Sequence, residues 1–321
     1  MPDPKRLTHK IRERLRSRSL GARPTPLAAA FGALTRAVGL DALWLKREDA
    51  IGGNKVRSLE FLLATAQPGD VVLTIGGSGS NHCLATAMHA RALGCRVALA
   101  QFPQPDTDTA VATAAGTATY ADIVRRSRTL AGFPLAFLQA WLAARQGGRV
   151  VRIPGGGASA PGVVGQLLAG LELADQMSEP PDALVTPLGS GGTAAGLVLA
   201  MATLGWPTRV IAVRVAPRII ASRWRIARLV RAAQRLLERH DIPLPADLSR
   251  LTILDALGRG YGLPTAAGES ARSRAAEHGL VLDPTYGAKA FAVLPECARR
   301  GFRRVVFWHT FARPSIPESA A

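Results

Sequence analysis

Short apolar runs alternate along the chain with longer amphipathic stretches, and glycine-rich turns separate the two. The apolar runs are five or six residues long, which is typical of buried strands. In the amphipathic stretches apolar residues recur every three to four positions, which predicts helices. Strands are predicted at residues 42–46, 70–75, 95–100, 148–153, 183–188, 209–213 and 304–308. Helices are predicted at residues 28–38, 56–64, 83–93, 163–177, 194–204 and 223–239.

This alternation of strand, turn and helix predicts an α/β fold. Strands separated by helices pair in parallel through right-handed crossovers. In such sheets, ligands bind outside the carboxyl ends of the strands. The glycine-rich turns fall at those ends, so we expect the turns to build the functional site.

The composition fits a globular protein with a large core. The chain has 321 residues, 48% of them hydrophobic, and the apolar runs 133–144 and 197–204 are too short to cross a bilayer. No secretory signal is recognisable, and the basic residues 1–20 are expected to form a helix or a surface arm, with a short targeting segment left open. Three cysteines without metal-ligand spacing indicate a reducing compartment, so we expect a cytoplasmic protein with no membrane partner.

A net charge of +17 raises the question of nucleic-acid binding. Aromatic residues make up only 5% of the chain, and it contains no base-stacking motif and no zinc-finger spacing. Only five of the 40 basic residues are lysines, and so much arginine beside alanine and glycine indicates a bias in coding composition. We therefore expect no nucleic-acid partner and a solvated arginine face on the predicted helix 223–239.

The motif Gly52-Gly53-Asn54-Lys55 places a lysine between a turn and the predicted helix 56–64. The two glycines can adopt backbone angles closed to other residues, and the positive end of the helix dipole favours the neutral form of the lysine amine. A neutral amine can form a Schiff base with a carbonyl group. Lys55 is therefore a candidate carrier of an aldehyde cofactor, and a solvated lysine in a turn is the alternative.

The turn Gly189-Ser190-Gly191-Gly192-Thr193 joins a predicted strand to a predicted helix. Backbone N–H groups at such a junction converge on an anion, and the helix dipole favours negative charge there. The turn lacks the lysine of the nucleoside-triphosphate loop and the spacing of the dinucleotide fingerprint. A monophosphate fits it best, and a plain tight turn is the alternative. A carbonyl-binding lysine and a monophosphate site together suggest pyridoxal 5′-phosphate.

Further motifs give the chain a specific resemblance. They are, in order, Lys46-Arg47-Glu48-Asp49, the lysine turn, Gly76-Gly77, Ser80-Asn81-His82, the 189–193 turn, Leu282-Asp283-Pro284-Thr285-Tyr286 and His309-Thr310. From about residue 24 to residue 310 the chain resembles the D-cysteine desulfhydrase and 1-aminocyclopropane-1-carboxylate deaminase family of pyridoxal-phosphate enzymes. The resemblance implies the tryptophan-synthase-β-like fold, with two doubly wound three-layer αβα domains and mostly parallel sheets. Residues 1–53 and 163–321 would form the large domain and residues 54–162 the small one.

The same resemblance implies which residues hold the cofactor. Lys55 matches the Schiff-base lysine, and Lys289 is expected to be structural. Asn81 matches the residue that hydrogen-bonds the ring hydroxyl, and Thr310 lies at the edge of the ring. The phosphate would be bound by Gly189, Ser190, Gly191, Gly192 and Thr193. No metal is implied.

Other matched residues are expected to act on the substrate. Ser80 matches the residue near the substrate carboxylate and α-carbon, and Asn81 and His82 adjoin it. His82 is either part of this site or a hydrogen-bonded structural histidine, which is the commoner case. Tyr261 and Tyr286 match two active-site tyrosines, and the alternative for each is a core position.

The resemblance implies a lyase or deaminase that acts on a small amino acid and works as a homodimer. Lys55 would move the α-proton, a β-substituent such as thiolate would leave, and a 2-oxo acid and ammonia would be released. A 1-aminocyclopropane-1-carboxylate deaminase and a racemase, ammonia-lyase or synthase of the same fold are the enzymatic alternatives. A catalytically inactive basic binding protein is the alternative outside enzymes.

Three departures from the family pattern, and the residue at position 310, narrow these expectations. The loop between Asp49 and Gly52 is shorter than usual. Gly287 stands where the deaminases have a glutamate near the ring nitrogen and the desulfhydrases a small hydroxyl residue. Thr310 is of the desulfhydrase type, but Phe311-Ala312 replaces the usual Gly-Gly after it. These features favour β-elimination over cyclopropane opening, with a substrate that can differ from D-cysteine.

Overall fold

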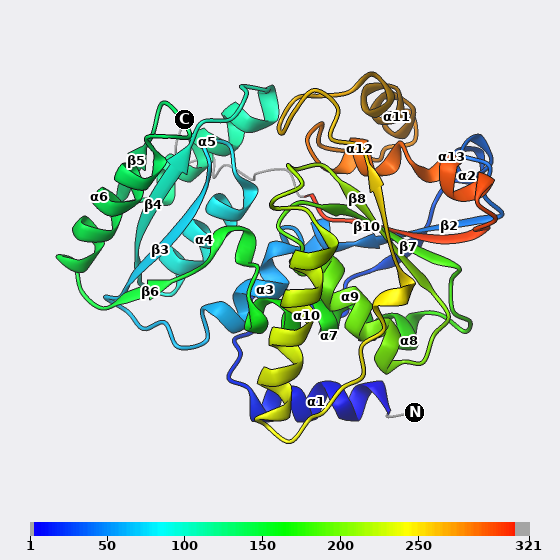
Figure 1. The fold of residues 1–321 in the computed structure, drawn as a ribbon, viewed down its shortest axis with the longest axis horizontal. Helices are drawn as coiled ribbons and strands as arrows, with labels where there is room; N and C mark the ends of the chain where they lie inside the picture. Colours follow the sequence, from blue (N-terminus) through cyan, green and yellow to red (C-terminus); the bar gives the residue numbers. More distant parts are fainter. Residues whose placement is uncertain (1–2, 312–321) are drawn as a thin grey trace.

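The computed structural model describes residues 3–311 and confirms the α/β class, with ten strands in this part of the chain arranged in two sheets (Figure 1). The six-stranded sheet has the order β1 (Leu27–Ala29), β2 (Ala42–Arg47), β10 (Arg304–His309), β7 (Ala183–Leu188), β8 (Arg209–Arg214) and β9 (Leu251–Asp255). Its neighbours pair in parallel, except for β1, which is antiparallel to β2. The four-stranded sheet is parallel throughout, with the order β5 (Ile123–Arg126), β4 (Arg96–Phe102), β3 (Val71–Gly77) and β6 (Val150–Arg152).

Helices cover both faces of the six-stranded sheet. Alternate residues of each strand face opposite layers: Leu184 packs toward one group of helices, and Val185 packs toward the other. The first group is α1 (Pro4–Arg14), α7 (Ala160–Leu171), α8 (Leu173–Gln176), α9 (Gly192–Thr203) and α10 (Arg223–Glu238). The second group is α2 (Gly32–Ala37), α11 (Ala266–Ala276), α12 (Gly287–Phe291) and α13 (Leu294–Arg299).

The four-stranded sheet is also enclosed by helices. Val72 faces a layer formed by α3 (Lys55–Leu62), α4 (Asn81–Ala92) and α5 (Asp108–Tyr120), and Leu73 faces α6 (Phe133–Arg145) on the other side. Short 3₁₀ segments, η1 (Glu48–Ile51), η2 (Gly155–Gly157) and η3 (Leu248–Arg250), complete the secondary structure of residues 3–311. Each sheet is therefore the middle of three layers, which confirms the predicted doubly wound architecture.

Helix α3 lies between the two sheets and packs closely against α7. A Cβ atom on Gly165 of α7 would overlap the carbonyl oxygen of Arg57 in α3. Any larger residue at position 165 would push the two helices apart. This contact sets the position of α3, which begins at Lys55.

The structure corrects several details of the sequence prediction. The predicted helix 28–38 begins too early, because residues 27–29 form β1, and only Gly32–Ala37 form the helix α2. In β1, Leu27 pairs with Lys46 of β2. The predicted helix 163–177 is instead two helices, α7 and α8, which meet at Glu172. The strands β5 and β9 and helix α5 were not predicted, and the apolar run 133–144 lies in α6.

The basic N-terminal segment forms the helix α1, with Leu7 and Ile11 buried in the core. The division into domains at residues 53/54 and 162/163 stays a prediction. Among the helices of residues 3–311, none combines the length and the apolar character needed to cross a bilayer.

Candidate functional site

A large cavity lies where strands of both sheets end. Its volume is about 780 Å³, within the roughly 300–1,000 Å³ typical of ligand pockets. Residues that follow β3, β4, β6, β7, β8 and β10 line it. The position agrees with the rule that ligands of parallel sheets bind at the carboxyl ends of the strands. The cavity lining includes every predicted site residue: Lys55, Ser80, Asn81, His82, Gly189, Ser190, Gly191, Gly192, Thr193, Tyr261, Tyr286 and Thr310.

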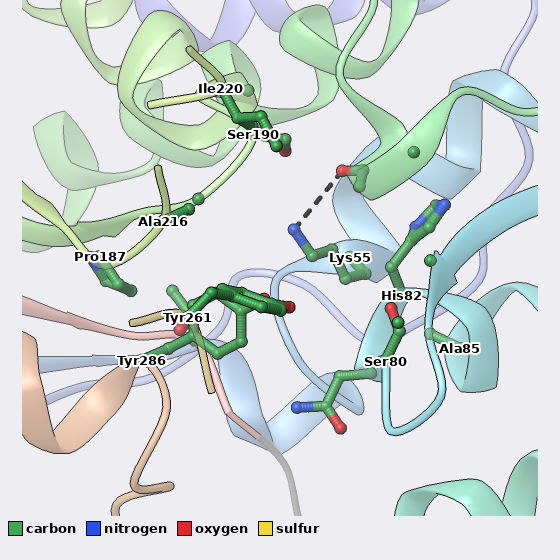
Figure 2. A pocket seen from close by; sticks show the side chains of 18 of the residues that line it. Lys55, Ser80, His82, Ala85, Pro187, Ser190, Ala216, Ile220, Tyr261 and Tyr286 are labelled. Atoms are coloured by element: carbon green, nitrogen blue, oxygen red, sulfur yellow. Dashed lines mark hydrogen bonds between the residues drawn. The ribbon is translucent and has the colours of Figure 1, made fainter. Parts of the chain in front are cut away.

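Lys55 is the first residue of α3, directly after the turn in which Gly52 and Gly53 have φ angles of 88° and 100°. These positive values explain the need for glycine at both positions. In Figure 2 the amine points into the cavity, between Ser190 and the tyrosine pair. Its Nζ atom donates to the carbonyl oxygen of Gly156 at 3.4 Å. Burial lowers the pKa of Lys55 to about 8, so about a fifth of the amine is neutral near physiological pH, far more than for an ordinary lysine.

The 189–193 turn connects β7 to α9 and provides an anion site. Gly191 has a φ angle of 90°, and no side chain caps the N-terminus of α9. The first N–H groups of this helix are therefore available to an anion, which the helix dipole also favours. A Cβ atom on Gly156 would overlap the hydroxyl of Ser190. Because Gly156 also accepts from Lys55, the lysine amine and the turn meet at this one residue.

Asn54 holds the lysine turn against the anion turn. Its side-chain Nδ2 donates to Thr193 Oγ1 at 2.8 Å, and its backbone N–H donates to the carbonyl of Thr310 at 3.2 Å. The carbonyl of Asn54 accepts from Gln166 Nε2 at 2.7 Å. Since the Thr193 hydroxyl accepts from Asn54, its own proton can be donated to an anion in the turn.

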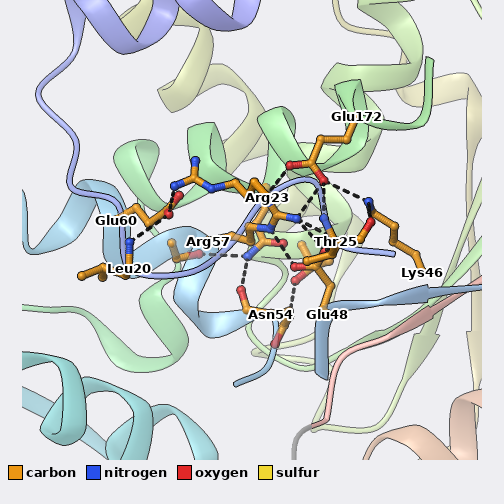
Figure 3. Close-up of polar contacts among 12 residues, drawn as sticks. Leu20, Arg23, Thr25, Lys46, Glu48, Asn54, Arg57, Glu60 and Glu172 are labelled. Carbon is orange, nitrogen blue, oxygen red and sulfur yellow. Dashed lines mark hydrogen bonds and ion pairs between the residues drawn. The ribbon is translucent and has the colours of Figure 1, made fainter. Parts of the chain in front are cut away.

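A buried ion cluster beneath the lysine turn fixes α3 (Figure 3). The Arg57 guanidinium binds two carboxylates, donating to Glu48 at 2.8 and 3.0 Å and to Glu172 at 2.6 and 2.9 Å. Lys46 donates to Glu172 at 2.9 Å and to the carbonyl of Thr25 at 2.9 Å. Lys46, Glu48 and Arg57 are at most 1% exposed.

The cluster joins β2, η1, α3 and the junction of α7 and α8. Burial would raise the pKa of Glu172, but the hydrogen bonds and charge of Arg57 hold this pKa below its usual range. Glu172 is therefore ionised, and each buried charge has an opposite partner. A carboxylate left without its arginine would be strongly destabilising here, so the cluster makes the position of α3 specific.

The N-terminus of α4 carries the predicted substrate residues. Ser80 is the N-cap, and its Oγ accepts from the backbone N–H of Cys83 at 3.4 Å. The Asn81 amide oxygen lies 3.2 Å from Thr113 Oγ1, whose single proton also points to the carbonyl of Thr109 at 2.7 Å, so the amide is held beside this hydroxyl. The positive end of α4 at this point favours a carboxylate group.

His82 is held as a neutral ring. The hydroxyl of Thr74 donates to the carbonyl of Ile153 at 2.9 Å, so at 2.9 Å it accepts from His82 Nε2. Burial, aided by the charge of Lys55, lowers the pKa of His82 to about 3. A ring with this pKa is neutral near neutral pH and carries its single proton on Nε2, and the geometry supports a structural, hydrogen-bonded histidine.

Tyr261 and Tyr286 form a hydrogen-bonded pair across the cavity from Lys55. Their hydroxyl oxygens are 2.5 Å apart, and their rings meet edge to face (Figure 2). Burial raises the pKa of both phenols, and that of Tyr286 most strongly, so both keep their protons near neutral pH. One proton serves the pair, and the second is available to another acceptor.

Three groups of residues line the cavity although the sequence did not predict them as site residues. The carboxylate of Asp283 lines the cavity and accepts backbone N–H bonds from Thr285, Tyr286 and Gly287 at 3.1, 2.7 and 2.8 Å, which orients the loop that carries Tyr286. The Asp-Pro-Thr-Tyr sequence was a signal for this cap. Gly155 and Gly156 line the cavity, and Gly156 lies between Lys55 and Ser190. The third is Arg225, which the sequence pattern assigned to a solvated face.

The structure also shows where Thr310 and Lys289 lie relative to the cavity. Thr310 follows β10 and lines the cavity together with buried Phe311, whereas Ala312 lies outside the described residues. Lys289 Nζ donates to the carbonyl of Leu257 at 2.9 Å, and the residue does not line the cavity. Within residues 3–311, no three His, Cys, Asp or Glu side chains come together in a way that could hold a metal ion.

The residues present fit a phosphorylated aldehyde. An uncapped helix N-terminus is available for the phosphate, and a buried, partly neutral amine adjoins it. Both line one cavity of sufficient volume. Fold and site together define the class of α/β enzymes that use pyridoxal 5′-phosphate.

Comparison with known families matches residues 18–310 to the pyridoxal-phosphate dependent enzymes, and the chain belongs to this family. A D-cysteine desulfhydrase of Salmonella choleraesuis is 33% identical over 294 residues, which cover 85% of this chain and 88% of the relative. A protein of Pyrococcus horikoshii, described as a candidate 1-aminocyclopropane-1-carboxylate deaminase, is 30% identical over 288 residues, 86% of each chain.

Solved structures confirm the fold. A crystal structure of an ACC deaminase homologue superposes with a TM-score of 0.82 at 26% identity, covering 97% of this chain and 95% of that one. A threonine deaminase of Solanum lycopersicum shares the fold at 18% identity, with a TM-score of 0.65 over 99% of this chain and 88% of that one. The cofactor of the family is pyridoxal 5′-phosphate.

Replacement of Arg57 tests the role of the ion cluster. Arg57→Met keeps most of the side-chain volume but leaves Glu48 and Glu172 without their shared cation, so we expect the free energy of unfolding to fall by roughly 3–5 kcal/mol. Urea titration followed by fluorescence measures it. Arg91→Met, which breaks the surface pair with Asp122, is the matched control and should cost less than about 1 kcal/mol. Equal effects of the two substitutions would contradict the structural role of the cluster.

The lowered pKa of Lys55 predicts a specific pH dependence. Only the neutral amine reacts with an acylating reagent, so labelling of Lys55 in the cofactor-free protein should rise with pH through a midpoint of about 8. Peptide mass spectrometry after brief labelling at each pH gives the midpoint. A midpoint near about 10.4, the value of an ordinary lysine, would show that the amine is not desolvated.

Proposed function

We propose that this enzyme is a lyase that removes a β-substituent from a small amino acid and releases a 2-oxo acid and ammonia, as a D-cysteine desulfhydrase does. The observation that carries the proposal is the placement of Lys55, whose partly neutral amine lies beside the 189–193 turn in a cavity that also contains two protonated tyrosines. The resemblance to named desulfhydrases over most of the chain supports the same reaction.

The cofactor would be held by residues from both sheets. The N–H groups of the 189–193 turn and the Thr193 hydroxyl would bind the phosphate, and Lys55 would bind the aldehyde carbon. Asn81 would donate to the ring hydroxyl, with Thr310 at the ring edge. When bound, pyridoxal 5′-phosphate supplies an electron-withdrawing ring that acidifies the substrate α-carbon.

Different side chains would then bind the substrate and carry out the two proton transfers of the reaction. The N-terminus of α4, with Ser80 and Asn81, binds the substrate carboxylate. The Lys55 amine takes the proton from Cα, and the bond from Cβ to the leaving group breaks with both electrons on that group. Tyr261 and Tyr286 can donate a proton to the departing thiolate. Addition of water to the released enamine gives the 2-oxo acid and ammonia.

Residue 287 supports elimination over cyclopropane opening. In the deaminases that the chain resembles, this position carries a glutamate, but here it is Gly287. A Cβ atom at this position would lie 3.0 Å from Asp283 Oδ1, so a second carboxylate would meet the first. The similarity to an ACC deaminase homologue makes the deaminase the second candidate, and racemase, ammonia-lyase and synthase activities differ from both in their products.

We also propose that the protein is a cytoplasmic homodimer. The resemblance supports the dimer, and three free buried cysteines accord with a reducing compartment. Light scattering during size-exclusion chromatography should give twice the mass of one chain. A mass equal to one chain at micromolar concentration would contradict the dimer without affecting the proposed reaction.

The proposed reaction is tested by offering D- and L-amino acids with thiol, chloride or hydroxyl at Cβ, and 1-aminocyclopropane-1-carboxylate, while pyruvate, 2-oxobutyrate and ammonia are assayed. We expect 2-oxo acid and ammonia in equal amounts from a β-substituted substrate. Lys55→Ala should lower turnover by at least about 10²–10⁴-fold because the base is removed, and the exposed-lysine control Lys5→Ala should leave it unchanged.

Three outcomes would contradict the proposal. 2-Oxobutyrate from the cyclopropane substrate alone would favour the deaminase. A change of chirality without ammonia would indicate a racemase. No turnover by a protein that binds the cofactor would favour a binding protein.

A further inference from the structure

Arg225 lies on the first turn of α10 beside the anion turn. The helix begins after the N-cap Ser222, whose hydroxyl accepts from the backbone N–H of Arg225 at 3.3 Å. The Arg225 side chain is half-buried and lines the same cavity as Lys55. Its neighbour Arg223 instead uses its guanidinium to bind the carbonyls of Leu248 and Leu251 at 2.5 and 2.9 Å.

The guanidinium of Arg225 is tethered at one end only. Its Nε atom donates to the carbonyl oxygen of Ser190 at 3.1 Å, in the middle of the 189–193 turn. Within residues 3–311, no carboxylate lies at ion-pair distance from it, and its two Nη groups have no hydrogen-bond partner. A planar guanidinium held through Nε still presents two N–H groups that match the oxygens of a phosphate.

Packing between α10 and the turn fixes this arrangement. A Cβ atom on Gly191 would contact Ile226 at 3.4 Å and Leu229 at 3.5 Å, so the helix lies directly on the turn. Ile226 is fully buried and Leu229 is nearly so. Because Ile226 and Leu229 anchor α10 in the core, the position of Arg225 beside Ser190 is fixed.

The negative charge of a bound phosphate needs a positive partner, and Arg225 is placed to supply it. Among the described residues that line the cavity, Lys55 and Arg225 are the only lysine and arginine. An amine that binds the aldehyde cannot also neutralise a dianionic phosphate, and backbone N–H groups supply only partial charges. Arg225 then remains as the full positive charge next to the turn.

We infer that Arg225 is a ligand of the cofactor phosphate and completes the site formed by the 189–193 turn. The inference rests on the cofactor of the family and not on the proposed substrate. Arg225 acts through binding, so its loss lowers the affinity for the cofactor more than it alters the reaction.

The test compares two ligands that differ only in the phosphate. Dissociation constants for pyridoxal 5′-phosphate and for pyridoxal are measured by absorbance titration of the cofactor-free protein and its variants. Arg225→Ala should weaken binding of the phosphorylated ligand roughly 10- to 100-fold, as expected for charge-assisted hydrogen bonds, and leave the affinity for pyridoxal unchanged. Arg225→Lys should recover part of the loss. Arg231→Ala, on the exposed face of the same helix, is the charge-matched control and should change neither constant.

The outcomes separate this inference from its alternatives. Equal weakening of both ligands would overturn it, because the arginine would then only support the fold. Unchanged cofactor binding with a raised KM for acidic substrates would also overturn it, by assigning Arg225 to a substrate anion. Wild-type protein that binds the cofactor but catalyses no elimination would refute the proposed function alone.

Discussion

The site depends on one interaction, in which the buried guanidinium of Arg57 binds the carboxylates of both Glu48 and Glu172. Buried charges are stable only when each has a well-placed opposite partner, so this guanidinium tolerates few positions. Its partners come from η1 and from the junction of α7 and α8, segments more than 100 residues apart in sequence. Because Lys55 begins the same helix two residues earlier, fixing Arg57 also fixes the direction of the lysine.

Exclusion of water then determines the protonation states in the cavity. Burial lowers the pKa values of Lys55 and His82 and raises those of Tyr261 and Tyr286. Each shift favours the uncharged form of its group. The cavity thus combines a partly neutral amine with uncharged proton donors, and the guanidinium of Arg225 adds a permanent positive charge beside the 189–193 turn. This separation suits a ligand with an electrophilic carbon at one point and an anion at another.

The elements whose signals are local could be predicted from the sequence. Seven strands and the two glycine turns stand in contiguous residues, and the structure confirms them. The helix predicted at 28–38 began too early because alanine favours helices locally, whereas the pairing of Leu27 with Lys46 depends on the next strand, β2. Arg225 was misplaced for the same reason, since its partner Ser190 lies 35 residues away. Tyr261 and Tyr286 were predicted as site residues only through the family resemblance. No local sequence pattern indicates that Glu172 forms an ion pair with Arg57.

The central claim is that the amine at position 55 carries the cofactor. Borohydride reduction of the protein loaded with pyridoxal 5′-phosphate, followed by peptide mass spectrometry, tests it directly. The account predicts a reduced phosphopyridoxyl group on the peptide that contains Lys55, at one per chain. Modification at Lys289 instead, or no modified peptide from protein that retains the cofactor's absorbance, would contradict it.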